Sequence, residues 1–283
     1  MTLLRAHVTL CAHRFPMPLD NALEDSASSR ALSALKNIVQ TVQDYTLLSV
    51  EAVASIFRTP FYLDDTLYQM DVIGIGSLPI VVLTGFFIGA VMVLQTAAQF
   101  SRFGETALVG DIVAISIIRE LGPSITSLLV AGRNASGIAS ELGSMLVTEQ
   151  VDAMRAMGTD PVKKLVTPRV VATTLMLPLL TAIADFVGLV GGYLISHFQL
   201  RLDPVQYWTR AIHALEFGDL VQGLVKPFIF GFILSSVGCY YGLAVKGGTR
   251  GVGRATTQAV VTASVIILIS NFFITRLLLF IFP

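Results

Sequence analysis

The sequence predicts an all-α polytopic membrane protein in which an interfacial N-terminal helix precedes five transmembrane helices. Of the 283 residues, 54% are hydrophobic and only 13% are charged, and the apolar residues gather in long runs. Soluble domains carry about 25% charged residues, whereas a helix crosses a bilayer with about 20 apolar residues. Continuous runs also differ from the alternating pattern of β-barrel strands. The formal net charge of zero leaves no basic field that would attract nucleic acid.

Two segments precede the first apolar run. Residues 1–30 contain Pro16, Pro18 and a polar stretch, and we expect them to form a flexible extension. Residues 31–72 contain an amphipathic helix, which we expect to lie in the membrane interface; packing on the protein itself is the alternative. Its polar positions recur at helical spacing: Lys36, Gln40, Asp44, Glu51, Ser55 and Arg58. Its other faces are apolar: Leu32, Leu35, Val39, Val42, Val50, Val53 and Phe57.

Residues 73–283 form the predicted transmembrane domain, and the first run has no charged residue. The predicted spans are residues 73–97, 106–132, 170–197, 224–245 and 259–282. With the N-terminus inside, 13 Lys and Arg residues fall in inner segments and 3 in outer ones. The positive-inside rule therefore predicts a cytoplasmic N-terminus and a periplasmic C-terminus. Residues 134–167, between the second and third spans, then face the cytoplasm.

Two adjacent charged residues lie within the second span. Arg119 and Glu120 are followed closely by Pro123, which favours a kink. An ion in the bilayer costs several kcal/mol unless it is paired or hydrated, so such residues are functional candidates. Neighbours on a helix point about 100° apart, so we expect these two side chains to face a cavity or another helix rather than each other. A contact with a ligand head group and an interhelical ion pair both remain open.

Three more charged residues interrupt the later spans. Asp185 is the deepest, and we expect it to pair with a neighbouring helix. Lys226 and Arg276 lie near the ends of their runs, where long side chains reach toward the interface.

The sequence contains no nucleotide-binding motif. A phosphate-binding loop requires Gly-Lys followed by Ser or Thr, and none of the five lysines has this context. Any ATP and Mg²⁺ used by the protein would therefore bind to another chain. Histidines are scattered and the two cysteines, Cys11 and Cys239, form no framework, so we expect neither catalytic residues nor a metal site.

Four motifs carry a family resemblance. They are RELGP at 119–123, AGR at 131–133, ELGSMLVTEQVDAMRAMGTDP at 141–161 and LVTPR at 165–169. These segments resemble the MlaE/YrbE permease family, the membrane subunits of Mla and Mce type ABC transporters. The resemblance covers residues 31–283 in organisation, whereas residues 1–30 depart from the family pattern.

The resemblance implies a homodimeric ABC permease of the bacterial inner membrane. Two ATPase subunits would bind below it and a lipid-carrying MCE-domain protein above it. The complex would move phospholipids or related lipids between inner and outer membranes and maintain outer-membrane lipid asymmetry, while this chain itself is no enzyme. The implied lipid-binding residues are Arg119, Glu120, Leu83, Phe86, Phe87, Ala90 and Leu94. The implied ATPase-coupling residues are Glu141, Thr148, Glu149, Gln150, Asp152 and Met157.

The residues themselves also favour a dimeric transporter that works with a partner protein. Five spans are too few to enclose a path for a two-tailed lipid, whereas a symmetric dimer supplies ten. Residues 149–157 combine polar groups with Met154 and Met157, which is typical of a helix that docks in a partner's groove; an ordinary solvated loop is the alternative. A secondary transporter or channel for a hydrophobic solute would often show an inverted repeat, and none is visible. A membrane-embedded lipid enzyme would require a clustered histidine or carboxylate site.

Overall fold

The computed structural model describes residues 27–56, 59, 62–101, 108–200 and 203–281. Most of the predicted extension, residues 1–26, lies outside the described residues. The chain divides into two units, residues 1–44 and 45–283, which are described separately. Helix α2 (Ala27–Ile56) begins in the first unit and ends in the second.

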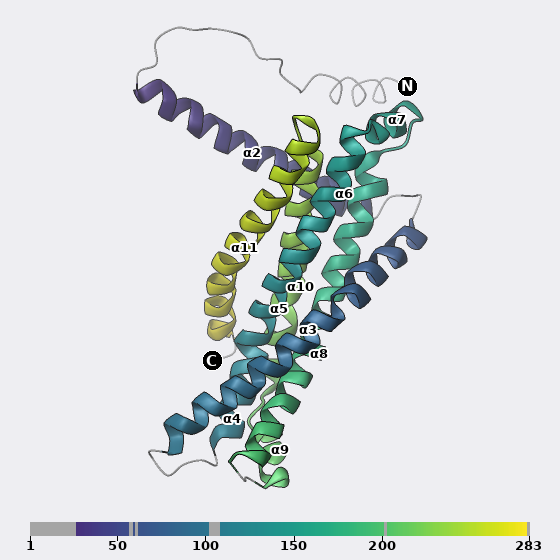
Figure 1. Cartoon of the computed structure of the whole chain (residues 1–283). Helices are drawn as coiled ribbons and strands as arrows, with labels where there is room; N and C mark the ends of the chain where they lie inside the picture. Colours follow the sequence, from purple (N-terminus) through teal and green to yellow (C-terminus); the bar gives the residue numbers. More distant parts are fainter. Residues whose placement is uncertain (1–26, 57–58, 60–61, 102–107, 201–202, 282–283) are drawn as a thin grey trace. The chain divides into compact units, whose positions relative to one another are not determined.

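The second unit is a helical bundle in which α7 and α9 lie at opposite ends (Figure 1). Its elements after α2, in chain order, are α3 (Leu63–Phe100), α4 (Val109–Ser116), η3 (Ile117–Leu121), α5 (Gly122–Val130), η4 (Ala131–Ala135), α6 (Ser136–Val147), α7 (Gln150–Ala156), η5 (Val162–Val166), α8 (Thr167–Phe198), α9 (Pro204–His213), α10 (Phe217–Leu243) and α11 (Gly248–Ile281). The elements labelled η are turns of π-helix.

Five helices in the described part of the chain are long and apolar enough to cross a membrane, which confirms the predicted fold class. They are Leu63–Phe100, Val109–Val147, Val162–Phe198, Phe217–Leu243 and Gly248–Ile281. Each is longer than the run that predicted it, because apolarity marks the hydrocarbon crossing while helical hydrogen bonding continues beyond it. For the same reason the segment predicted between the second and third spans is largely helical, with α6, α7 and η5.

Helices α3 and α8 pack closely because glycines remove side chains from their contact. A Cβ atom at Gly89 would overlap the carbonyl oxygen of Gly188, and one at Gly85 would lie 2.7 Å from the carbonyl oxygen of Ala184. Small residues allow such backbone approach between helices in membranes. Helix α8 thus holds α3 on one side and packs against α10 on another.

Three clusters of buried residues organise the bundle. The largest joins α8, α10 and α11 through side chains that include Leu177, Phe230 and Ile267. A second lies at the α9 end, where Tyr207 donates to the carbonyl of Leu189 at 3.3 Å. Burial raises the pKa of Tyr207 to about 12, so this phenol keeps its proton at neutral pH.

The third cluster anchors α7 and the end of α2. It joins Val151 of α7, Ala52 of α2 and Leu142 of α6, all of them buried. On α2, Val50 and Val53 are exposed as an interfacial helix requires, but Ser55, predicted on the polar face, is buried. The end of α2 packs on its own protein through small residues, which a hydrophobicity pattern cannot distinguish from a solvated face. The interfacial placement of this helix stays a prediction.

Candidate functional site

The site is built on a π-turn in the second span. Pro123 has no N–H and cannot donate to the carbonyl of Arg119, four residues earlier. The turn η3 lies at this point, and the ammonium of Lys226, from α10, donates to the carbonyl oxygen of Arg119 at 2.7 Å. Proline thus leaves a carbonyl free inside the span, and a lysine from another span satisfies it. Short π-turns are frequent at functional sites.

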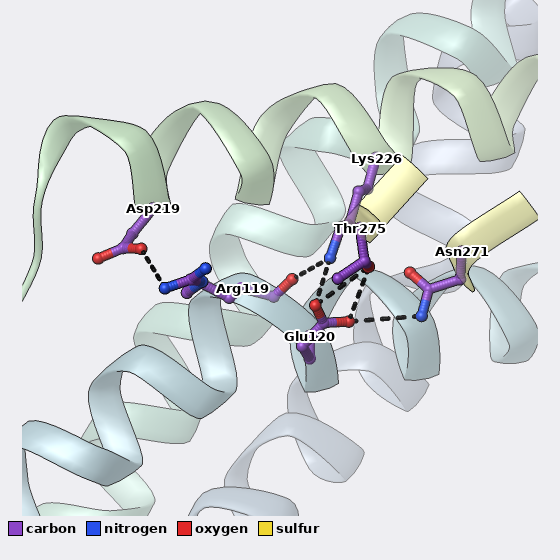
Figure 2. Close-up of polar contacts among 6 residues, drawn as sticks. All are labelled: Arg119, Glu120, Asp219, Lys226, Asn271 and Thr275. Atoms are coloured by element: carbon purple, nitrogen blue, oxygen red, sulfur yellow. Dashed lines mark hydrogen bonds and ion pairs between the residues drawn. The ribbon is translucent and has the colours of Figure 1, made fainter. Parts of the chain in front are cut away.

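Glu120 is the centre of a polar cluster that joins three spans (Figure 2). Its Oε1 forms an ion pair with Lys226 Nζ at 2.7 Å. Thr275 Oγ1 donates to the same oxygen at 3.1 Å, and Asn271 Nδ2 donates to Oε2 at 3.4 Å. Asn271 and Thr275 are four residues apart and therefore share one face of α11. The Lys226 side chain is fully buried, whereas 40% of the Glu120 side chain is exposed, so the carboxylate can also meet a ligand.

Arg119 points to a different partner. Its Nη1 lies 3.3 Å from Oδ1 of Asp219, in the first turn of α10 (Figure 2). The Asp219 side chain is fixed by the N-terminal cap of α10, because its Oδ2 accepts a hydrogen bond from the backbone N–H of Glu216 at 3.0 Å. The expectation that Arg119 and Glu120 face other helices rather than each other is confirmed. Both side chains form interhelical ion pairs, and a direct contact with a ligand stays a prediction.

The expected position of Lys226 is wrong. Its side chain does not reach toward the interface but is fully buried in the cluster. The physical reason is that α10 begins at Phe217, seven residues before the apolar run, because Asp219 and Gln222 belong to the helix. Arg276 is exposed on α11, five residues before that helix ends at Ile281.

Asp185 does not show the predicted pairing either. It is buried in α8, and its Oδ1 has no hydrogen-bond partner within the described residues. The carboxyl group packs against the backbone of Gly122, which carries no side chain that could pair with it.

The apolar residues predicted to line a lipid site on α3 differ in exposure. Leu83 and Phe87 are exposed, Phe86 and Leu94 are partly buried and Ala90 is buried. A small cavity beside η3 is lined on α3 by a different set of residues, Val81, Thr84, Gly85 and Ile88. A lipid-binding role for the predicted five residues stays a prediction.

The predicted coupling segment combines a buried anchor with exposed polar groups. Val151 is buried, whereas Glu149, Gln150, Asp152 and Met157 are exposed. Glu149 has a φ of 60°, the left-handed conformation, which turns the chain between α6 and α7. The segment is therefore a turn followed by a short helix that Val151 anchors, and its contact with an ATPase stays a prediction.

Other predicted coupling residues make internal contacts. Thr148 Oγ1 donates to the carbonyl of Ser144 at 2.8 Å, at the end of α6. Glu141 pairs with the buried Arg169 of α8 at 3.0 Å. Arg169 also donates to the carbonyl of Leu165 at 2.8 Å, within η5. The ion pair of Glu141 with Arg169 therefore connects the second and third spans near the coupling segment.

Sequence reasoning missed four members of the cluster. Asp219 lies outside the apolar run of its helix, and the position of Lys226 near the end of its run predicts an interfacial side chain. Asn271 and Thr275 are uncharged, but polar residues at four-residue spacing in an apolar run were an available signal for a buried polar face.

These features define a multi-pass α-helical membrane protein with ion-paired groups inside its spans. The chain matches the family model described as Permease MlaE over residues 66–277, and it belongs to the MlaE permease family. It is therefore a non-enzymatic transmembrane subunit of the inner membrane.

Relatives occur in bacteria and in a plant. A probable ABC transporter permease protein of Rickettsia felis is 47% identical over 238 residues, which cover 84% of this chain and 92% of the relative. The chloroplastic protein TRIGALACTOSYLDIACYLGLYCEROL 1 of Arabidopsis thaliana is 37% identical, with coverage of 80% and 65%. The intermembrane phospholipid transport system permease protein MlaE of Haemophilus influenzae is 32% identical, with coverage of 74% and 81%.

Proposed function

We propose that this chain is the permease subunit of an ATP-driven ABC transporter that moves phospholipids or related lipids between the inner and outer membranes. This activity would maintain the lipid asymmetry of the outer membrane. The observation that carries the proposal is the family match over residues 66–277, supported by the name of the Haemophilus relative, an intermembrane phospholipid transport permease.

The polar cluster supports a role in moving an amphiphile. Glu120 and Arg119 are partly exposed between spans and are held by Lys226 and Asp219. Charged groups of both signs suit the phosphate and polar parts of a lipid head group, whereas apolar side chains of the spans suit its acyl chains. Conformational change in the transporter would alter these ion pairs and thereby the affinity for lipid.

A homodimer completes the proposed transport path. Only 11% of the residues in the most apolar part of α11 are buried within this chain, and Val265, Leu268 and Phe272 on this helix are exposed. Asn271 and Thr275 connect the same helix to Glu120. A second copy packed against α11 would bring two such clusters near one cavity, as the symmetry of a dimer requires.

The proposed partners would bind at the two ends of the bundle. ATP and Mg²⁺ would bind to a separate ATPase subunit, whose groove would receive α7. The N-terminus would be cytoplasmic and the C-terminus periplasmic, and an MCE-domain lipid-binding protein would dock at the α9 end.

The coupling assignment is tested by Glu149→Lys. We expect the complex to keep hydrolysing ATP while lipid transport falls about tenfold, because a reversed charge at the coupling segment disturbs a contact worth about 1.4 kcal/mol or more. The measurement compares ATP hydrolysis with lipid transfer in proteoliposomes. Lys246→Glu, a charge reversal in the α10–α11 connection, is the control. An active and fully coupled Glu149→Lys complex would refute the assignment.

Composition of the purified complex tests the function and the lipid site together. The chain is expressed with its neighbouring genes, purified in detergent and examined by mass spectrometry. We expect a dimer with an ATPase subunit, an MCE protein and phospholipid, and we expect loss of most phospholipid in Arg119→Ala/Glu120→Ala. Asp64→Ala/Arg254→Ala, which removes one exposed acid and one exposed base outside the cluster, is the control. A chain that purifies without any ATPase would favour a secondary transporter, and unchanged phospholipid in the double variant would reduce Arg119 and Glu120 to structural ions.

A further inference from the structure

A buried acid that belongs to no described ion pair, Asp185, packs against Gly122 beside η3. Asp185 is in α8, thirteen residues before Phe198, which corresponds to about 20 Å along the helix. Its exposed fraction is 8%, and its Oδ1 has no hydrogen-bond partner within the described residues. A carboxylate in such surroundings is costly unless it meets a proton or a cation.

The backbone N–H of Gly122, beside Asp185, already has an acceptor. The carboxyl group occupies the space in which a side chain of Gly122 would lie. The N–H of Gly122 is used inside the span, where it donates to the carbonyl of Ile117. Because Gly122 has no side chain, the Asp185 carboxyl group packs directly against the backbone there. It receives no hydrogen bond from the N–H of Gly122.

Neighbouring basic side chains are engaged elsewhere. Arg119, on η3, pairs with Asp219, and Lys226, on α10, pairs with Glu120. Among the described ion pairs none includes Asp185. The described basic side chains therefore provide no cation for a charged Asp185.

Asp185 lines a cavity of about 290 Å³ between α8 and α10. Asp185 is the only charged residue that lines this cavity, and the other lining residues are apolar. They are Ile118, Ala182, Phe186, Leu189, Leu220, Gly223 and Leu224. Phe186 and Leu224 are more than half exposed, so the cavity opens on the side of the bundle. Gly223, which carries no side chain, brings α10 within contact of Ile118 on η3.

We infer that this cavity binds an amphiphile with a primary ammonium group, whose nitrogen meets Asp185 and whose chain lies along Phe186, Leu220 and Leu224. Charge complementarity selects the ammonium, and the hydrocarbon walls select an attached apolar chain. An aminophospholipid head group and a single-chain alkylamine both carry this chemistry. The inference does not depend on ATP-driven transport, because it rests on α8, η3 and α10 of this chain.

Photolabelling tests the inference directly. The full-length chain, with any subunits that co-purify, is placed in phosphatidylcholine nanodiscs and exposed to photoreactive dodecylammonium or to the photoreactive alcohol of the same length. We expect the ammonium probe to label residues 182–189 and 220–224 at least fivefold more than the alcohol does. Asp185→Asn should reduce labelling by the ammonium to the level of the alcohol. Equal labelling by both probes, or labelling unchanged in Asp185→Asn, would overturn the inference.

A second variant guards against a folding defect. Leu224→Trp keeps the carboxylate but fills the cavity, so both probes should lose labelling at these segments while the melting temperature stays near that of the parent chain. Persisting ammonium labelling in this variant would contradict the assigned cavity. Photoreactive phosphatidylethanolamine and phosphatidylcholine then distinguish the sources: selective labelling by phosphatidylethanolamine identifies an aminophospholipid, and labelling by the alkylamine alone identifies a single-chain ligand.

Discussion

Replacing Lys226 with methionine is expected to abolish the proposed lipid transport and to destabilise the chain. The substitution removes the ammonium that pairs with Glu120 and that donates to the carbonyl of Arg119. Both acceptors would lose their strongest donor inside the membrane, at a cost of about 1–3 kcal/mol for each group. The cost at the Glu120 carboxylate is reduced because 40% of that side chain is exposed, whereas the carbonyl of Arg119 has no such compensation. Transport would be measured by lipid transfer in proteoliposomes, and stability by the melting temperature in detergent.

Two further variants separate the cluster from a general loss of positive charge. Lys246→Met removes an exposed lysine from the α10–α11 connection and should change neither quantity appreciably. Glu120→Gln/Lys226→Met should be less destabilised than the sum of the two single variants, because it leaves no unpaired ion. Wild-type transport by Lys226→Met, or additive losses in the double variant, would contradict a functional ion pair.

The second large effect is expected for Gly89→Ala at the contact of α3 with α8. One added methyl group would overlap the carbonyl oxygen of Gly188, and this oxygen belongs to backbone that cannot rotate away. The two helices must separate, and overpacking of this kind costs about 1–3 kcal/mol or more. We expect a markedly lower melting temperature and little monodisperse protein in size-exclusion chromatography.

The matched control for this substitution is Gly137→Ala. Gly137 is also helical, in α6, but a Cβ atom there would meet no atom within 4 Å of the chain. Alanine has the higher helix propensity, so this variant should be as stable as the parent or slightly more stable. Equal behaviour of the two variants would show that the α3–α8 contact is looser than the structure indicates.

Most of the fold follows from hydrophobicity, because each span has to satisfy its backbone hydrogen bonds internally. The ends of the spans do not follow, since polar residues such as Asp219 continue the helix of α10 beyond the apolar run. That difference accounts for the wrong assignment of Lys226. Ser55 shows the same limit on α2, where close packing of small side chains buries a residue that a polar pattern assigns to a solvated face.

The candidate site was predictable in part. Arg119 and Glu120 stand out as adjacent ions in a span, and their divergence follows from helix geometry. Their partners required the tertiary arrangement, because Lys226 and Thr275 are more than a hundred residues away in sequence. The π-turn at η3 likewise depends on a proline together with a lysine from another helix.

ATP-dependent phospholipid transfer is the most direct test of the proposed function. The chain, co-purified with the proposed ATPase and MCE subunits, would be reconstituted in liposomes with a fluorescent phospholipid. Transfer to the MCE protein or to acceptor vesicles would then be followed with ATP, without ATP and with an applied proton gradient. We expect phospholipid movement that requires ATP and is lost in Lys226→Met. Movement driven by the gradient in the absence of ATP, or ATP hydrolysis that never moves phospholipid, would contradict the proposed function.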